Sequence, residues 1–354
     1  MRDRAESPAC PRHLTDMEKV PFLDYREVLV TGGTGFLGKA VCRALIARGY
    51  LPRILVRIGS EGAIPDDIRR ASRVTPGDIT NRESVENAAQ STNAIVHLAG
   101  IIREVPGKDV TFEKVHEEGT RNAVHAAKLW RIPRFVHVSA LGAAPGSTGR
   151  YFDSKGRAEE IVRQSGLDWT IFRPSGVFGP GDRFIGELGR ALRRTPVLPV
   201  PGDGEFLLQP VFVGDVVKGI VDCLARPDTE TAAFDVGGPE RFTFNELVDR
   251  IAAAAGVRVR KVRVPIPRVR RATRFFSRYE KFPLPAEMLD VLLAGHTCDG
   301  VPYYSAFGLT PFPLSGYLAR SKGTGNAGGG GFFTGDAGMS PGMGEKDSRS
   351  SEAA

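Results

Sequence analysis

Short runs of β-branched and aliphatic residues alternate along the chain with stretches in which apolar residues recur every three or four positions. The first pattern is typical of strands and the second of amphipathic helices, so their alternation predicts βαβ units and a parallel sheet. Several runs are apolar at almost every position, which indicates strands covered on both faces. The predicted strands are 27–32, 53–57, 73–78, 94–99, 134–140, 168–174 and 232–238. The predicted helices between them are Lys39–Arg48, Arg82–Gln90, Phe112–Trp130 and Ser154–Gln164.

This order predicts an α/β fold, a doubly wound parallel Rossmann sheet over residues 25–240 with a smaller C-terminal substrate lobe. The lobe would combine an insertion at about 178–206 with residues 241–320. Residues 1–24 precede the regular pattern and are predicted to be a flexible extension. Residues 321–354 are rich in glycine and poor in apolar side chains, so we predict that this tail is disordered.

Composition narrows the class of protein. The chain has 354 residues, of which 41% are apolar, and no apolar run approaches the ~20 residues of a membrane-spanning helix. The four cysteines are far apart, without a C-x-x-C pair, and the six histidines show no ligand spacing. We therefore expect no metal site and a reducing, cytoplasmic location, with peripheral attachment to the inner face of a membrane left open.

The stretch VLVTGGTGFLGKA, residues 28–40, joins a predicted strand to a predicted helix through clustered glycines. Gly32, Gly35 and Gly38 fit the pattern T-G-x-x-G-x-x-G, in which glycines allow a tight turn and a close approach of the backbone. The N–H groups that open the helix can then hold a pyrophosphate. We predict a dinucleotide site here, the alternative being a cofactor-free relic of the same fold; its other turn residues are Thr34, Phe36 and Leu37.

Arg57 is the last residue of the second predicted strand, where an NAD-preferring site would place an acid that accepts from the ribose hydroxyls. A guanidinium suits a 2′-phosphate instead, so Arg57 favours NADP(H) as the cofactor over NAD(H). The alternative is an ordinary surface arginine at the end of a strand.

Further motifs follow the later strands in a fixed order. GDIT contains Asp78 and Ile79, HLAG contains Leu98, Ala99 and Gly100, YFDSK gives Y-x-x-x-K, and RPSGVFGPGD contains Pro174 and Val177. With the glycine turn, these motifs resemble the extended and atypical short-chain dehydrogenases/reductases of the NAD-dependent epimerase/dehydratase type, over roughly residues 26–250. The resemblance implies that the cofactor is bound by the residues just named and also by Tyr151 and Lys155 of the YFDSK motif.

Three other stretches are closer to one branch of this family. HVSALGA at 137–143, residues 183–221 and FDVGGPERFTFNELV at 234–248 resemble the dehydrogenase-like accessory subunit of respiratory complex I and its bacterial relatives. This likeness fades after about Arg260. It implies a protein that holds NADPH and docks on a membrane complex.

Tyr151 and Lys155 are four residues apart and so share one face of a helix. A free tyrosine, with a pKa near 10, is a poor acid or base at neutral pH, but a neighbouring ammonium stabilises its phenolate. Tyr151 is therefore the candidate proton-transfer group, and the resemblance implies that Lys155 also holds the nicotinamide ribose.

The roles of Ser139 and Asp78 each have an alternative. Ser139 is the candidate hydroxyl for polarising a carbonyl, but the family's catalytic hydroxyl corresponds to the next position, here Ala140, so Ser139 could instead bond the cofactor or Tyr151. By resemblance, Asp78 accepts from the adenine amino group; the alternative is a helix N-cap at the following turn.

The net charge of +7 is concentrated in residues 258–281, where ten Lys and Arg residues accompany one acid, so the rest of the chain is close to neutral and nucleic acid is not an expected partner. Within this segment, Arg268–Arg278 predicts a basic amphipathic helix, with Val269, Ala272, Phe275 and Phe276 on its apolar side. Such a helix could lie on an anionic membrane surface or a membrane complex. The alternative is a solvated helix packed on its own domain.

Three functions remain. The first is an oxidoreductase that uses the Tyr151–Lys155 pair on a small or lipophilic carbonyl or alcohol. The second is a non-catalytic NADPH-binding accessory protein of a membrane respiratory complex. The third and weakest is a sugar-nucleotide epimerase or dehydratase. The intact pair favours the first, whereas Ala140 and the basic segment favour the second.

Overall fold

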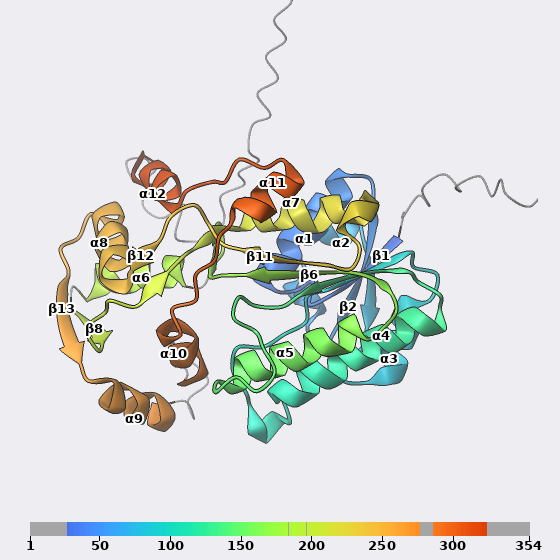
Figure 1. The fold of residues 1–354 in the computed structure, drawn as a ribbon, viewed down its shortest axis with the longest axis horizontal. Coiled ribbons are helices and arrows are strands. Elements are labelled where there is room, and N and C mark those ends of the chain that lie inside the picture. Colours follow the sequence, from blue (N-terminus) through green and yellow to red (C-terminus); the bar gives the residue numbers. More distant parts are fainter. Residues whose placement is uncertain (1–26, 183, 196, 277–285, 324–354) are drawn as a thin grey trace, which may run out of the picture.

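The computed structural model describes residues 27–182, 184–195, 197–276 and 286–323. Its centre is a seven-stranded sheet in which every neighbouring pair is parallel (Figure 1). The strands, in spatial order, are β11 (Ala232–Val236), β6 (Asp168–Pro174), β5 (Arg134–Val138), β4 (Ala94–His97), β1 (Glu27–Thr31), β2 (Leu51–Val56) and β3 (Arg73–Pro76). The predicted doubly wound parallel sheet is confirmed, and its order reverses between β1 and β4, where ligands bind in such folds.

Helices cover both faces of the sheet (Figure 1). Along β1, Val28 and Val30 pack on one side and Leu29 packs on the other, and all three are fully buried. A strand buried on both faces is apolar at every position, which explains the continuous apolar runs in the sequence. One side carries α1 (Phe36–Ala47), α2 (Asp66–Arg70), α7 (Val213–Asp222) and α11 (Val301–Phe307); the other carries α3 (Arg82–Ala89), α4 (Gly119–Leu129) and α5 (Arg150–Arg163).

A separate core holds the second lobe together. It unites Phe178, Ile185 and Val200 from the middle of the chain with Phe244 and Leu314 from its later part. Its helices are α6 (Ile185–Arg194), α8 (Phe244–Ala255) and α12 (Leu314–Gly323). Its paired strands are β7 (Val177–Phe178) with β10 (Val211–Phe212), β8 (Val197–Pro201) with β13 (Arg260–Val264), and β9 (Leu207–Leu208) with β12 (Phe242–Thr243).

The C-terminal segment is divided between the two cores. Tyr303, Tyr304 and Phe307 of α11 pack into the core of the sheet, whereas α12 packs on the lobe. Asp215 of α7 fastens the connection, because its carboxylate accepts hydrogen bonds from the Phe312 N–H (2.9 Å) and the Tyr304 hydroxyl (3.3 Å). The segment therefore returns to the Rossmann layer before it ends on the lobe.

Helix α9 (Ile266–Phe276) overlaps the predicted basic helix Arg268–Arg278 but begins two residues earlier, and its faces differ from the prediction. Val269 and the buried Thr273 lie one turn apart on the inner face, whereas Phe275 is 53% exposed. The expected single apolar side, with Val269 and Phe275 together, is therefore wrong. The helix α10 (Ala286–Leu293) packs beside α9 and covers the inner face of α9.

Several predictions fall at or beyond the limits of the described residues. The expected extension at 1–24, Arg278 and residues 324–354 of the expected tail lie outside them, while 321–323, which we expected to begin the tail, continue α12. Within the described ranges, no helix is long and apolar enough to cross a membrane.

Candidate active site

The glycine turn connects β1 to α1 in a conformation that requires glycine. Gly32 has φ +73°, and a Cβ there would lie 2.8 Å from the Ala99 nitrogen. A Cβ on Gly38 would lie 2.2 Å from the Gly32 carbonyl oxygen, so α1 can approach the turn only without a side chain at this position. Gly35, the residue before α1, has no side chain to cap the helix. The backbone donors that open α1 are thus left to a ligand, as the sequence predicted for a pyrophosphate.

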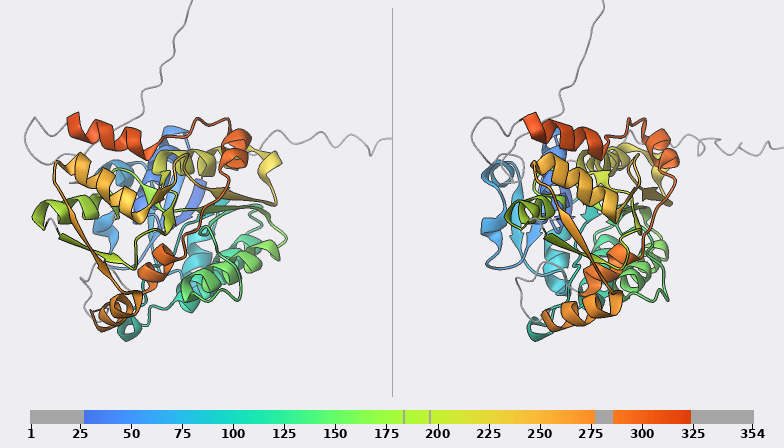
Figure 2. Two further views of the ribbon diagram at one scale, coloured as in Figure 1. Left: turned by 60° about the vertical axis from the view of Figure 1, so that its left-hand side comes forward. Right: turned by 90° about the vertical axis from the view of Figure 1, so that its left-hand side faces the viewer.

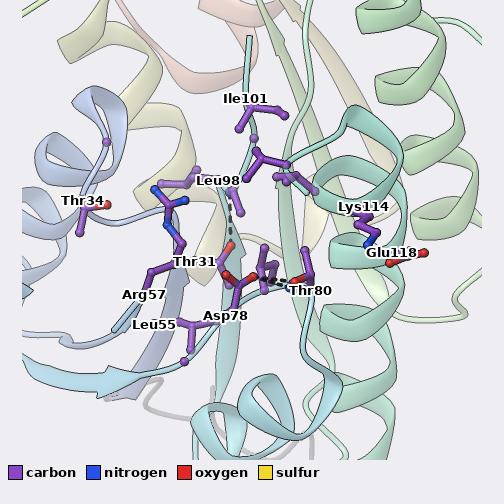
Figure 3. A pocket seen from close by; sticks show the side chains of 18 of the residues that line it. Thr31, Thr34, Leu55, Arg57, Asp78, Thr80, Leu98, Ile101, Lys114 and Glu118 are labelled. Carbon is purple, nitrogen blue, oxygen red and sulfur yellow. Dashed lines mark hydrogen bonds between the residues drawn. The ribbon is translucent and has the colours of Figure 1, made fainter. Parts of the chain in front are cut away.

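A pocket of about 420 Å³ opens at the carboxyl ends of β1, β2 and β4 (Figure 3). This is the point where the strand order reverses. The predicted cofactor residues on its wall are Gly32, Thr34, Gly35, Arg57, Asp78, Ile79, Leu98, Ala99 and Gly100. The other predicted residues, Phe36, Leu37, Gly38, Tyr151, Lys155, Pro174 and Val177, do not line this cavity, although Gly38 shapes the turn beside it.

Arg57 and Asp78 lie at neighbouring strand ends in the pocket. Figure 3 shows the exposed Arg57 side chain rising from the end of β2 towards Leu98. Asp78 accepts hydrogen bonds from the Thr80 N–H (2.9 Å) and hydroxyl (2.8 Å). The cap of α3 is Asn81, whose Oδ1 accepts from the Ser84 N–H at 2.8 Å. The capping alternative for Asp78 is therefore wrong, and Asp78 lies on the pocket wall instead.

Lys155 is buried behind Gly100, a residue of the pocket wall. Lys155 is only 5% exposed, and its Nζ donates a hydrogen bond to the Val138 carbonyl at 3.1 Å. A Cβ on Gly100 would lie 3.0 Å from Nζ, so the ammonium borders the pocket wall. Burial lowers the pKa of Lys155 to about 8, and the Glu159 carboxylate opposes that shift. Lys155 therefore gains and loses its proton around pH 8, much closer to neutral pH than an exposed lysine does.

Tyr151 stands one helical turn before Lys155, in the first turn of α5. Its ring packs edge-on against Phe112, His116 and Phe152, with centroid separations of 5.9, 5.7 and 5.3 Å. Desolvation raises the pKa of its phenol to about 12. In this state the phenol keeps its proton, which is the form that can donate to a carbonyl oxygen.

Ser139 is buried at the end of β5 beside Glu159 rather than hydrogen-bonded to Tyr151. Its hydroxyl helps to lower the Glu159 pKa, together with Arg173 and Arg163, but makes no well-formed hydrogen bond within the described part of the chain. Glu159 itself is bound by Arg173 at 2.6 Å and Arg163 at 2.9 Å. Of the two alternatives to direct catalysis, the bond from Ser139 to Tyr151 is absent here.

A buried histidine supports the pair, and the sequence analysis missed it. His116, 1% exposed, accepts from the Ile101 N–H at Nε2 (3.0 Å), so Nδ1 carries the proton and donates to the Ser154 hydroxyl (2.8 Å). Ser154 in turn donates to the Tyr151 carbonyl at 2.9 Å. Burial and the Lys155 charge hold the pKa of His116 well below its usual value. His116 thus joins the β4 loop to the start of α5 as a neutral group.

The segment that carries His116 is a π-helical turn, Glu113–Glu118, where we predicted regular helix. The spacing of the histidines along the chain predicts no role for His116, and among the described residues no three metal-binding side chains gather. A π-turn inside a helix is frequent at functional sites, but the sequence carries no clear signal for one. The pocket residues Lys108, Lys114 and Glu118, from this same region, were also not predicted.

Comparisons with known proteins identify the class of domain. A family model described as NAD(P)H-binding matches residues 32–183. The chain is 31% identical over 242 residues to the ceramide reductase of Caulobacter vibrioides, covering 68% of this chain and 74% of that protein. It is 29% identical over 246 residues to the mitochondrial NADH-ubiquinone oxidoreductase 40 kDa subunit of Neurospora crassa, covering 67% of this chain and 62% of the subunit.

Among solved structures, the UDP-glucose 4-epimerase of Thermotoga maritima superposes with a TM-score of 0.65 at 21% identity, covering 84% of this chain and 97% of the epimerase. At that identity the likeness shows the fold alone. The fold, the glycine turn and the pocket define an NAD(P)H-binding Rossmann protein. More narrowly, the chain belongs to the extended short-chain dehydrogenase/reductase family, which confirms the resemblance predicted from its motifs.

Proposed function

We propose that this protein is an NADPH-dependent oxidoreductase that interconverts a carbonyl and an alcohol on a small or lipophilic substrate. The observation that carries the proposal is the Tyr151–Lys155 pair: a phenol one helical turn from a buried ammonium that borders the dinucleotide pocket at Gly100. The ceramide reductase among the relatives supports a lipophilic substrate.

A bound nicotinamide would supply or accept the hydride. The chain's own residues transfer the proton. Tyr151 Oη donates a proton to the carbonyl oxygen in reduction and accepts one from the substrate hydroxyl in oxidation. Burial alone raises the Tyr151 pKa to about 12, so the phenolate needs a positive neighbour. We assign that role to Lys155, which is one helical turn away and protonated below a pH of about 8, and which by family resemblance would also hold the nicotinamide ribose.

Polarisation of the substrate rests on Tyr151 in this proposal. Ser139 lies against Glu159, and Ala140 provides no hydroxyl at the following position. A direct catalytic role for Ser139 would require its hydroxyl to turn away from that carboxylate. We therefore assign Ser139 to the support of β5 and α5, with a cofactor contact as the alternative.

NADP(H) is the proposed cofactor, with NAD(H) as the alternative. The support is Arg57, an exposed guanidinium that rises over the pocket at the end of β2, where it could bind a 2′-phosphate through charge-assisted hydrogen bonds (Figure 3). The remaining predicted cofactor residues follow from the same family motifs. The proposed partner besides the substrate is an anionic membrane surface contacted through Arg268–Arg278. We also propose a cytoplasmic location that is peripheral to the membrane.

A second candidate is a non-catalytic protein that holds NADPH as a structural ligand. The observations that favour it are Ala140 and the similarity to the Neurospora respiratory subunit. The epimerase or dehydratase function has only fold-level support and ranks third.

The Tyr151→Phe variant tests the proposal, because it keeps the ring and its aromatic neighbours but removes the proton-transfer group. Turnover should fall by ~10²–10⁴ while NADPH affinity changes little. Tyr304→Phe, which alters a hydroxyl bound to Asp215 outside the pocket, is the matched control and should keep full turnover. Wild-type protein that binds NADPH but never oxidises it, with carbonyls and quinones offered, would favour the second candidate.

A further inference from the structure

The β8–β13 pair and helix α9 lie together at the end of the lobe that is remote from α3 and α4 (Figures 1 and 2). Three large apolar side chains are exposed in these elements: Val197 by 45%, Val262 by 42% and Phe275 by 53%. Each comes from a different element, β8, β13 or α9. Their exposure is a feature of this end of the lobe rather than of a single helix.

On α9, the exposed phenylalanine lies among arginines. Thr273 is 2% exposed and marks the inner face, on which Arg270 pairs with Asp290 of α10 at 2.8 Å. Phe275, four residues after Arg271 and seven after Arg268, lies on the opposite face. The outward face of α9 is therefore an aromatic ring beside two guanidinium groups.

The strand pair repeats this arrangement. Leu198 and Val200 of β8 pack on the lobe core, so the alternate residues Val197 and Pro199 face outward. The register sets Arg260 opposite Val197 and Val262 opposite Pro199, on the same outward face. This face thus also combines exposed apolar side chains with an arginine.

The cations of this end have few anionic partners. Within the described residues, Lys261 pairs with Asp249 and Arg270 with Asp290. No ion pair links the remaining arginines to any described acid. These exposed arginines are Arg258, Arg260, Arg263, Arg268, Arg271 and Arg274. Like charges at this density repel one another in water and are stabilised by an anionic surface.

We propose, resting on the membrane partner named under the proposed function, that this basic end docks on the surface of an anionic lipid bilayer; the basic end comprises Val197, Val262, Phe275 and the six arginines just named. The arginines bind headgroup phosphates, while the three apolar side chains enter the boundary between headgroups and acyl chains. Exposed apolar side chains beside arginines suit a lipid surface, which offers both phosphates and acyl chains, better than an acidic protein. The interaction does not depend on the NADPH chemistry.

Flotation with vesicles tests the proposal. Wild-type protein should float with vesicles of phosphatidylcholine mixed with phosphatidylglycerol, remain unbound with phosphatidylcholine alone, and come off as salt rises. The triple variant Arg268→Gln, Arg271→Gln, Arg274→Gln should bind about 100-fold more weakly, at roughly fivefold per arginine. The matched control, Arg70→Gln, Arg121→Gln, Lys128→Gln, removes the same charge from exposed positions on α2 and α4 and should bind like wild type.

The apolar contribution is tested separately. Phe275→Ser should weaken vesicle binding about tenfold and leave its salt dependence unchanged, because the charges remain. Leu129→Ser, which changes a side chain 50% exposed on α4, should have no effect on binding. NADPH affinity, measured on every variant, should equal that of wild type and so shows that each one is folded.

Three results would overturn the proposal. Equal loss of binding in the triple variant and its control would show a net-charge effect without a defined surface. Binding that ignores Phe275→Ser and is matched by binding to poly-glutamate would assign the arginines to acidic polymers instead of lipid. Absence of flotation at low salt would refute docking on lipid directly.

Discussion

Replacement of the buried Lys155 by methionine should stabilise the protein at neutral pH while removing its function. Burial shifts the Lys155 pKa from 10.5 to about 8, so the folded state holds the ammonium at a penalty of about 3 kcal/mol relative to the unfolded chain. Methionine has a similar length and no charge. The lost hydrogen bond to the Val138 carbonyl costs about 1 kcal/mol, so a net gain of about 2 kcal/mol is expected.

The sign of the pH dependence follows from the direction of the shift. Below a pH of about 8, Lys155 is protonated in both states and the full penalty is present. Between that pH and 10.5, the unfolded chain binds more protons than the folded one, so the stability of wild type rises with pH. The advantage of Lys155→Met should therefore shrink across this range.

Urea unfolding of both proteins at neutral pH and near pH 10, on cofactor-free samples, measures this difference. Lys128→Met, at an exposed position of α4, is the matched control and should match wild type at both pH values. Turnover of Lys155→Met should be lost and its NADPH affinity reduced, since it loses both the charge one helical turn from Tyr151 and the proposed ribose contact. A variant less stable than wild type at neutral pH, with no rise of wild-type stability towards pH 10, would refute the reasoning.

Two other substitutions test the pocket. Gly38→Ala would place a Cβ 2.2 Å from the Gly32 oxygen, so it should cost about 1–3 kcal/mol of stability and lower NADPH affinity at least about tenfold. Gly62→Ala, which adds a Cβ in open space, is the control and should change neither quantity. Calorimetry measures the stability, and titration measures the affinity. Wild-type NADPH binding by Gly38→Ala would contradict the close approach of α1. Arg57→Asp exchanges a proposed phosphate contact for a repulsion and should shift the NADPH-to-NADH affinity ratio by at least about tenfold, in titrations with both cofactors. An equal loss of both would show that Arg57 does not bind the phosphate.

Much of the fold was predictable because each strand of the sheet carries its own apolar run. All seven predicted strands belong to the central sheet. The boundaries were less predictable: β2 begins at Leu51, before the predicted 53, because its pairing with β1 extends over Pro52. Helix α5 begins at Arg150 rather than Ser154, since Gly149 offers no side-chain cap that would signal the start.

The pocket residues that were predicted belong to contiguous motifs at strand ends, where neighbours in the chain are neighbours in space. The support from His116 was not predictable, because it depends on a π-turn and on Ser154 and Ile101 from two other elements. The faces of α9 likewise depend on where α10 packs, which no periodicity within α9 reveals.

The transfer of deuterium from labelled NADPH to a product tests the central claim most directly. NADPH carrying deuterium at its transferable position is mixed with the protein and a panel of lipophilic carbonyls, and the products are analysed by mass spectrometry. We predict an alcohol that contains the label with wild type, and almost none with Tyr151→Phe, although both bind NADPH. NADPH that stays bound and unoxidised across the whole panel would contradict the oxidoreductase assignment.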